Sequence, residues 1–335
     1  MNILVTGGAG FIGSHTVVEL INAGYNPIII DDFSNSEKRV LERLKNITGK
    51  DVKCYEGNCN DFETVEKICT TENIEGVIHF AASKAVGESV VDPLKYYENN
   101  VGATVTVMKV LSKLKIKNVV FSSSCTVYGE PDQIPVTEET PRKTATSPYG
   151  NSKAICEDIL RDMSIAKLGF RTISLRYFNP VGAHPSAEIG ELPNGVPSNL
   201  IPFVTQTAAG IREKLTVFGD TYDTPDGSNI RDFIHVVDLA KAHVAALNLL
   251  QKQEDNYYDV FNIGTGEGNS VLEVIKTFEK VNNLKLNYVI GPARQGDVIK
   301  IYGNVDKAAK LMGWKTEKTL EDSLRDAWRW QQSLS

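Results

Sequence analysis

The chain has 335 residues, of which 41% are hydrophobic and 23% charged, and its 36 basic and 42 acidic residues give a formal net charge of −6. This balance is that of a globular protein and excludes a disordered chain, a collagen-like chain and a basic nucleic-acid-binding arm. No apolar run is long enough to span a membrane, and the first residues show no basic leader or apolar signal core. We therefore expect a cytoplasmic protein that binds neither membranes nor nucleic acids.

The first half of the chain alternates short apolar runs with longer amphipathic stretches. The runs of strand length are Ile3–Thr6, Pro27–Asp31, Val52–Glu56, Gly76–Ala81, Asn118–Ser123 and Thr172–Arg176. The first helix is expected from Phe11 to Ala23, with Gly24 as a left-handed cap. Such alternation predicts an α/β fold, a doubly wound parallel sheet with helices on both faces. Ligands of these sheets bind beyond the carboxyl ends of the strands.

The composition of the sequence and its pattern of apolar residues change after about Phe178. Residues 180–232 are rich in Pro, Gly and Asn, with one helix expected near 200–212. We expect a Rossmann domain over residues 1–178 and a smaller C-terminal α/β substrate domain over residues 179–335. A helix and a strand expected within residues 233–263 would return to the first domain, and two further helices follow Asp306.

Four glycines separate the first expected strand from the first helix. Gly7, Gly8, Gly10 and Gly13 satisfy both G-x-x-G-x-x-G and G-x-G-x-x-G. Glycine there permits a tight turn and the close approach of a pyrophosphate, which the N–H groups of the helix N-terminus bind. Asp31 ends the second strand, where a carboxylate accepts hydrogen bonds from ribose hydroxyls and repels a 2′-phosphate. The pattern predicts NAD as the cofactor; the alternative is a glycine-rich turn without a ligand.

A tyrosine and a lysine follow on one helix. Ser147 and Pro148 are typical of an N-cap and a first helical residue, and Tyr149 and Lys153, four residues apart, share a face. Ser124 closes the serine run at the end of the fifth strand, at the ligand-binding edge. These three side chains are predicted to converge at the nicotinamide; the alternative is a surface helix that happens to carry a lysine.

A tyrosine needs a lowered pKa to act as a base. Its ordinary pKa of ~10 must fall by about 3 units for work near pH 7, and a nearby ammonium supplies roughly 1–3 units. We infer that the positive charge of the oxidised nicotinamide and the first helix's dipole supply the rest for Tyr149.

Several longer motifs make the chain similar to a known family. TGGAGFIGSH, SSSCTVYG, SPYGNSK, RYFNPVGAHPS, NIRDFIHVVDLA and FNIGTG together resemble the extended short-chain dehydrogenase/reductase family, and within it the nucleotide-sugar 4-epimerases. The likeness covers nearly the whole chain. It implies reversible epimerisation of UDP-glucose and UDP-galactose at C4 through a transient 4-keto sugar, with NAD reduced and re-oxidised in place.

The resemblance also implies roles for individual residues. Tyr149 would take the proton of the sugar O4, Ser124 would hydrogen-bond O4, and Lys153 would hold the nicotinamide ribose. With these three, the implied NAD contacts are Gly7, Gly10, Phe11, Ile12, Gly13, Asp31, Asp32, Phe33, Ser34, Asn35, Ser36, Asn58, Cys59, Phe80, Ala81, Ala82, Ser83, Lys84, Asn99 and Phe178. With Ser124 and Tyr149, the implied nucleotide-sugar contacts are Asn179, Asn199, Leu200, Val217, Phe218, Arg231, Arg294, Asp297 and Ile301.

Some positions of the predicted site leave alternatives open. Arg231 and Arg294 suit bidentate binding of phosphates, the alternative being surface ion pairs. Asn58 stands where relatives often have aspartate, and its carbonyl can still accept from the adenine amine. Ile301, intermediate in size between the residues that relatives carry there, leaves acceptance of N-acetylated sugars open, although non-acetylated sugars are favoured.

Rival functions remain. A UDP-N-acetylhexosamine or UDP-glucuronate 4-epimerase would keep the same triad. A 4,6-dehydratase is less favoured because Cys125 and Thr126 stand where those relatives carry an Asp–Glu pair, and a non-catalytic NAD-sensing regulator would not need Tyr149 or Lys153.

The helices expected over 93–114 and 148–168 predict a homodimer, because equivalent helices pair in relatives; packing on the sheet accounts for part of each apolar face. The five cysteines, irregularly spaced and odd in number, predict reduced thiols, and the histidines show no ligand spacing with them, so no metal is expected.

Overall fold

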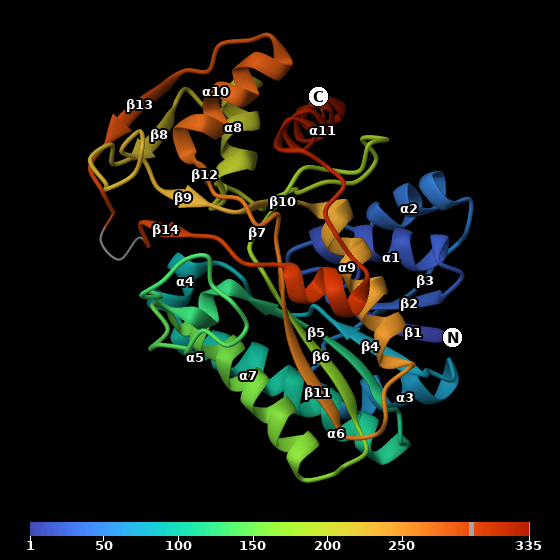
Figure 1. Ribbon diagram of the computed structural model, residues 1–335. Helices are drawn as coiled ribbons and strands as arrows, with labels where there is room; N and C mark the ends of the chain where they lie inside the picture. The colour runs from blue at the N-terminus through green and yellow to red at the C-terminus, as the bar shows by residue number, and fades with distance from the viewer. Residues whose placement is uncertain (295–297, 335) are drawn as a thin grey trace.

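A computed structural model describes residues 1–294 and 298–334, and its largest element is a seven-stranded sheet (Figure 1). The order across this sheet is β11-β6-β5-β4-β1-β2-β3, with every neighbouring pair parallel. The strands are β1 (Asn2–Thr6), β2 (Asn26–Asp31), β3 (Lys53–Glu56), β4 (Gly76–His79), β5 (Asn118–Ser124), β6 (Arg171–Tyr177) and β11 (Tyr257–Ile263). The order reverses beside β1, which is the switch point where such sheets bind ligands.

Alternating side chains of the strands divide the core into two layers. Ile3 and Val5 of β1 pack into one apolar cluster and Leu4 into the other, as the period of two in a strand requires. The first cluster is closed by α1 (Phe11–Asn22), α2 (Val40–Thr48) and α9 (Val236–Leu250), and the second by α3 (Phe62–Thr71), α6 (Ala103–Leu114) and α7 (Pro148–Ile165). Helices on both faces of a parallel sheet confirm the predicted fold class (Figure 1).

The helix predicted over 93–114 is present with those bounds, and it contains a π-helical turn. After the separate helix α4 (Val86–Val91), the segment consists of α5 (Pro93–Tyr96), the π-helix η1 (Tyr97–Gly102) and α6. Asn100 in η1 accepts from the N–H of Ser83 at 2.8 Å and donates to Ser152 of α7 at 2.9 Å. These side-chain bonds to neighbouring elements accompany the widened turn, which apolar periodicity alone does not reveal.

The helix that carries Tyr149 begins as predicted and ends early. The hydroxyl of Ser147 accepts from the N–H of Gly150 at 3.2 Å, and Pro148 is the first helical residue. The helix ends at Ile165 rather than at 168, because Lys167 and Gly169 adopt positive φ angles of 56° and 86°. The short 3-10 helix η2 (Cys125–Tyr128) follows β5 directly.

A second unit begins at the carboxyl edge of the large sheet, since β7 (Asn179–Val181) starts two residues after β6 ends. Its small sheets pair β10 (Phe233–His235) with β7, β13 (Tyr288–Gly291) with β8 (Leu215–Phe218), and β12 (Asn269–Ser270) and β14 (Lys300–Ile301) with β9 (Ile230–Arg231). Its helices are α8 (Leu200–Ala208), α10 (Val271–Asn282) and α11 (Leu320–Ser333), whereas the π-helix η3 (Ala308–Met312) contacts α9 and β11 of the first unit. A third apolar cluster joins β7, β8, β10 and β13 to α8, α10 and α11.

The chain crosses between the units more than once. After β10 it forms α9, which packs on α1, and β11, which adds to the edge of the large sheet beside β6. Within residues 1–294 and 298–334, no helix has the length and apolar character needed to cross a bilayer.

Candidate active site

A cavity of about 1040 Å³ opens at the carboxyl edge of the large sheet. Loops that follow β1, β2, β3 and β4 line it, together with the start of α7, residues 188–199 of the second unit and Trp330 of α11. Of the residues predicted for the cofactor, the lining includes Gly7, Gly10, Phe11, Ile12, Gly13, Asp31, Asp32, Ser34, Asn35, Ser36, Asn58, Cys59, Phe80, Ala81, Ala82, Ser83, Lys84, Asn99, Tyr149 and Lys153. Residues far apart in the sequence therefore surround one space large enough for a dinucleotide.

Close packing within the protein, and not only a ligand, requires glycine at positions of this loop. Gly7 has φ +68°, and a Cβ there would lie 2.9 Å from the backbone N of Ala81. A Cβ on Gly13 would lie 2.3 Å from the carbonyl oxygen of Gly7. Gly10 differs, because it has an ordinary extended backbone and its nearest neighbour would be 3.3 Å away. Gly7 and Gly13 thus allow strand and helix to meet closely, and Gly10 faces the cavity.

The N-terminus of α1 fits a phosphate. Gly10 is the N-cap and no side chain caps the helix, so the first-turn N–H groups have no side-chain acceptor. Their dipoles point toward the cavity and favour an anion there. With the open space above Gly10, this arrangement fits the pyrophosphate of a dinucleotide.

Asp31 is buried at the end of β2 and holds the neighbouring loop. Its Oδ2 accepts from the N–H of Ala9 at 3.0 Å, and its Oδ1 accepts from the N–H of Phe33 at 3.0 Å and the hydroxyl of Ser36 at 2.9 Å. Burial nevertheless raises the pKa of Asp31, because desolvation outweighs these hydrogen bonds. A carboxylate at the cavity wall with further lone pairs remains suited to ribose hydroxyls.

Tyr149 and Lys153 lie side by side on α7 at the bottom of the cavity. The ammonium of Lys153 donates to the carbonyl oxygen of Ser122 at 2.8 Å and lies 5.0 Å from the ring centroid of Phe121. Ser124 ends β5, and its hydroxyl accepts from the N–H of Thr126 at 3.2 Å. The end of β5 and the first turns of α7 thus bring the predicted triad to one place.

The electrostatics of this group follow from burial. Burial lowers the pKa of Lys153 to about 8. Burial also raises the pKa of Tyr149, with a further increase from Tyr177 and an opposing decrease from its hydrogen bond with the Ser124 hydroxyl. In the ligand-free protein the phenol is therefore protonated at neutral pH. A ligand charge that stabilises the phenolate is needed before this tyrosine can act as a base.

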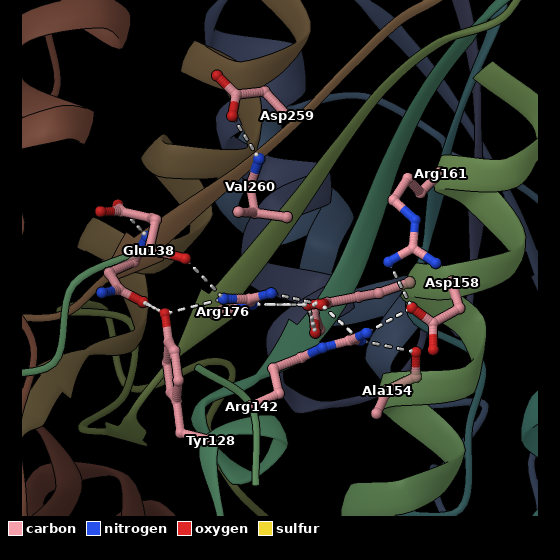
Figure 2. A network of polar contacts seen from close by, with 12 residues as sticks. Tyr128, Glu138, Arg142, Ala154, Asp158, Arg161, Arg176, Asp259 and Val260 are labelled. Carbon is pink, nitrogen blue, oxygen red and sulfur yellow. Dashed lines mark hydrogen bonds and ion pairs between the residues drawn. The ribbon is translucent and has the colours of Figure 1, made fainter. Parts of the chain in front are cut away.

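A buried ion-pair network connects β5 and α7, the two elements that carry the predicted triad (Figure 2). Glu157 of α7 accepts from Arg176 of β6 at 2.7 Å and from the hydroxyl of Ser123 of β5 at 2.6 Å. Arg176 donates to the hydroxyl of Tyr128 at 3.0 Å, and Arg142 donates to the Glu157 carboxylate at 3.5 Å. The network joins α7, β5, β6 and η2, so it fixes Ser124 relative to Tyr149.

Sequence reasoning missed these supporting residues. Glu157 and Arg176 are each at most 5% exposed, although they sit in segments that otherwise look like an ordinary helix and strand. The available signal was weak: an arginine in the middle of a buried strand requires a partner. Tyr177 lines the cavity and shares a short hydrogen bond with Ser122, and it was also not singled out.

Phe33, Ser124 and Phe178 complete the predicted cofactor set without lining the cavity. Phe33 has φ +55° and lies under the ammonium of Lys38. Phe178 packs in an apolar cluster with Cys125, Tyr128 and Ile301.

The residues predicted for the nucleotide sugar lie on several elements of the second unit. Asn199, the N-cap of α8, lines the cavity, while the others sit on neighbouring elements: Asn179 on β7, Leu200 on α8, Val217 and Phe218 on β8, Arg231 on β9, Arg294 after β13 and Ile301 on β14. The Val217 side chain points into the core of the second unit, which leaves only its backbone to contact a ligand. Asp297 lies outside the described residues.

Two pairs in this set are brought together. The guanidinium of Arg294 stacks 4.5 Å from the ring centroid of Phe218. Arg231 and Ile301 are direct partners between β9 and β14, and Arg231 donates to the carbonyl oxygen of Ile230 at 2.8 Å.

Thiol and metal chemistry find little support here. The five cysteines are free thiols, and burial raises the pKa values of Cys54, Cys59, Cys69 and Cys125 to about 12, so these are poor nucleophiles. Among the described residues, no group of three or more His, Cys, Asp or Glu side chains is arranged to hold a metal ion.

Known proteins share this sequence and architecture. The chain is 50% identical over 333 residues to a UDP-glucose 4-epimerase of Bacillus subtilis, covering 99% of this chain and 97% of that protein. It is 48% identical over 329 residues to a UDP-glucose 4-epimerase of Dictyostelium discoideum, covering 98% and 95%.

Solved structures agree. A UDP-glucose 4-epimerase from Stenotrophomonas maltophila, with bound NAD and formylated UDP-arabinopyranose, superposes with a TM-score of 0.97 at 42% identity over 100% of this chain and 98% of that one. One from Bifidobacterium longum, in complex with NAD⁺ and UDP, gives 0.96 at 48% identity over 99% and 98%. The model of the NAD dependent epimerase/dehydratase family matches residues 3–264. The chain therefore belongs to the NAD dependent epimerase/dehydratase family.

Proposed function

We propose that this protein catalyses the reversible epimerisation of UDP-glucose and UDP-galactose at C4, with NAD held in the cavity. The observation that carries the proposal is the convergence of the glycine loop, Asp31, Tyr149 and Lys153 on one space at the switch point of the sheet. Relatives that are 46–50% identical over nearly the whole chain bear the name of this activity. The rival activities named above have no comparable support.

The chain's own residues handle the proton. Tyr149 removes the proton of the sugar O4, and the hydroxyl of Ser124 hydrogen-bonds the same oxygen. Oxidised nicotinamide, held by Lys153 and the cavity-lining residues, would supply the redox chemistry at C4, as acceptor and then donor of the hydrogen with its electron pair on opposite faces of the sugar. Tyr149 then gives the proton back to O4, so that atoms and charge balance over the cycle.

Lys153 positions and tunes this base. One of its three N–H groups is used by the Ser122 carbonyl, which leaves donors for the nicotinamide ribose. Because its pKa is about 8, Lys153 is mostly charged at neutral pH and favours the phenolate of Tyr149. The charge of the cofactor adds to this effect and opposes the desolvation that raises the pKa of the phenol.

The remaining predicted contacts divide between the two ligands. We assign the cavity-lining residues listed above, with Phe33 and Phe178, to NAD. Asn179, Asn199, Leu200, Val217, Phe218, Arg231, Arg294, Asp297 and Ile301 are assigned to the UDP-hexose. Two arginines compensate for the net charge of −6, which does not attract an anionic substrate by itself.

We further propose a cytoplasmic homodimer that serves galactose metabolism. Strongly exposed apolar side chains cluster on α4 and α5, where Val90, Val91 and Leu94 are 62%, 86% and 77% exposed. Both helices contact α7, whose terminal Ile165 is 70% exposed. A second copy would cover this surface, and sedimentation at micromolar concentration is expected to give the mass of a dimer; a monomer would contradict it.

Turnover of purified protein tests the main proposal. UDP-galactose is expected to give UDP-glucose without added NADH, faster than UDP-N-acetylglucosamine or UDP-glucuronate are converted. Tyr149→Phe should reduce kcat by roughly 10²–10⁴ while UDP still binds. Loss of water from the sugar would indicate a dehydratase, and UDP-sugar binding without any turnover would indicate a regulator.

A further inference from the structure

One carboxylate at the cavity joins a residue assigned to the cofactor with a residue assigned to the nucleotide sugar. The Oε1 atom of Glu191 accepts from the ammonium of Lys84 at 3.1 Å and from the amide Nδ2 of Asn199 at 2.7 Å. Lys84 follows β4 of the first unit, and Asn199 begins α8 of the second. All three residues line the same cavity, and the Glu191 side chain is only 9% exposed.

The contact of Asn199 with Glu191 replaces the hydrogen bond that Asn199 would otherwise make with its own helix, α8. Asn199 is the N-cap of α8, where asparagine normally accepts a hydrogen bond from an N–H of the first helical turn. Its side chain makes no such bond and faces Glu191 instead. Asn199 therefore lacks the usual helix-capping bond and is oriented by a buried carboxylate for a role other than capping.

The chemistry of the carboxylate decides how the amide is turned. An ionised carboxylate only accepts hydrogen bonds, so Asn199 must present Nδ2 to it and not Oδ1. The amide then keeps its second N–H for a neighbouring acceptor, which suits the oxygens of a diphosphate. The negative charge of Glu191 also holds the Lys84 ammonium beside the same opening.

The backbone of Glu191 is itself firmly seated. Its carbonyl oxygen accepts from the indole N–H of Trp330 at 3.0 Å. A Cβ on the preceding residue, Gly190, would lie 2.4 Å from that indole ring, so chain and ring are in close contact. The guanidinium of Arg43 of α2 lies 4.9 Å from the ring centroid of Trp330, and Arg43 donates to the carbonyl oxygen of Glu188 at 2.8 Å. The segment therefore offers a fixed frame for the carboxylate.

We propose that Glu191 is a positioning residue for the nucleotide-sugar site, where its carboxylate orients the Asn199 amide and ties it to Lys84. The inference rests on the proposed function, since it gives Asn199 a role in binding the UDP-hexose. It adds a residue that touches neither reacting atom and acts through its two neighbours.

The variant Glu191→Gln tests this directly. Glutamine has the same shape and its amide oxygen can still accept from both donors, but it is neutral, so the charge-assisted bonds to Lys84 and Asn199 are weakened. We expect the KM for UDP-galactose to rise by roughly tenfold while kcat stays within about twofold, because the lost interaction acts equally on ground and transition states. Glu72→Gln is the matched control: its carboxylate, 8% exposed, accepts from the Lys53 ammonium and the Tyr55 hydroxyl away from the cavity, and KM should not change.

Two further variants separate positioning from a structural role. Asn199→Asp keeps a residue type suited to the N-cap position but sets two carboxylates against each other, so KM should rise as it does for Glu191→Gln. In an Asn199→Ala background, Glu191→Gln should add less than about twofold to KM, because its effect passes through the missing amide. Thermal unfolding without ligands should show similar midpoints for the single variants and wild type.

Three results would overturn the proposal. They are an unchanged KM in Glu191→Gln, a full additional effect in the Asn199→Ala background, and a fall in kcat alone. Calorimetric titration of UDP into each variant repeats the comparison independently of turnover. If wild type binds UDP but converts no sugar, the proposed function fails, and the affinities of the variants for UDP still decide the role of Glu191.

Discussion

Lys153 is 3% exposed, and burial destabilises the charge of its ammonium. Burial lowers its pKa to about 8 from the ordinary 10.5. Below pH 8 the lysine is charged in both the folded and the unfolded protein, and the folded state carries the full desolvation cost. Between pH 8 and 10.5 the folded protein loses this proton and the unfolded chain keeps it, so stability must rise with pH across that window.

This predicts a measurable difference between the ligand-free wild type and Lys153→Met. The free energy of unfolding of the wild type, relative to the variant, should increase by ~3 kcal/mol from below pH 8 to above pH 10.5. Urea titrations of both proteins across this range check the prediction. The subtraction removes the opposing titration of buried thiols and tyrosines, and a pH-independent difference would show that Lys153 is not desolvated.

Among individual residues, the sequence predicted the reacting and cofactor-binding side chains better than the side chains that hold them in position. Tyr149, Lys153 and Asp31 could be found because glycine spacing, helix period and strand ends place them by local rules. Glu157, Arg176 and Glu191 could not, since each gains its meaning from partners on elements distant in sequence. The upward shift of the Tyr149 pKa in the ligand-free protein was equally out of reach, because burial is a property of the folded molecule.

Among the elements, the glycine loop must meet two requirements: close packing of the backbone at Gly13, and open space for NAD at Gly10. Gly13→Ala places a methyl group 2.3 Å from the Gly7 carbonyl oxygen, so the loop must move, and we expect a loss of roughly 1–3 kcal/mol in stability. Gly10→Ala meets nothing closer than 3.3 Å and should fold with a loss below about 1 kcal/mol, yet bind NAD at least roughly tenfold more weakly. Denaturant unfolding and NAD titration of both variants distinguish these outcomes, and normal NAD binding by Gly10→Ala would contradict the assignment of this loop.

The ion pair that joins α7 to the sheet should contribute more to the free energy of unfolding than the ion pairs on the outside of the same helix. Glu157→Gln leaves Arg176 buried without its counter-charge, which predicts a loss of about 3–5 kcal/mol. Asp158→Asn, one residue along, removes ion pairs of a side chain that is 38% exposed and should cost less than about 1 kcal/mol. Urea unfolding gives both values, and equal losses would mean that the network in Figure 2 has no special weight.

Elements of the large sheet were predictable, and those of the second unit mostly were not. Buried parallel strands such as β1 and β2 appear as continuous apolar runs between helices, so their positions followed from pattern. Strands β9, β12 and β14 have two residues each, too few to show any period. The π-helix η1 was hidden because its irregular turn depends on bonds from Asn100 to Ser83 and Ser152.

For the whole molecule, the cavity predicts that cofactor binding is felt in both units. Residues 188–199 belong to the second unit but line the cavity, and they are tied to the first unit by Arg43 to Glu188, Lys84 to Glu191, and Asn194 to the carbonyl oxygen of Ser34. A ligand that fills this space stabilises the arrangement in which those contacts are made. Opening of the segment should then become rarer whenever NAD is bound.

Hydrogen exchange can measure this coupling. Adding NAD to the ligand-free protein should slow amide exchange at least roughly tenfold in residues 188–199, as well as in the loops after β2 and β4. Helix α10, which packs against α11 and has no residue in the cavity wall, should exchange as before and serves as the internal control. Protection confined to the first unit would mean that the second unit closes only when the sugar nucleotide arrives, and that the cavity wall formed by residues 188–199 is not set by the cofactor.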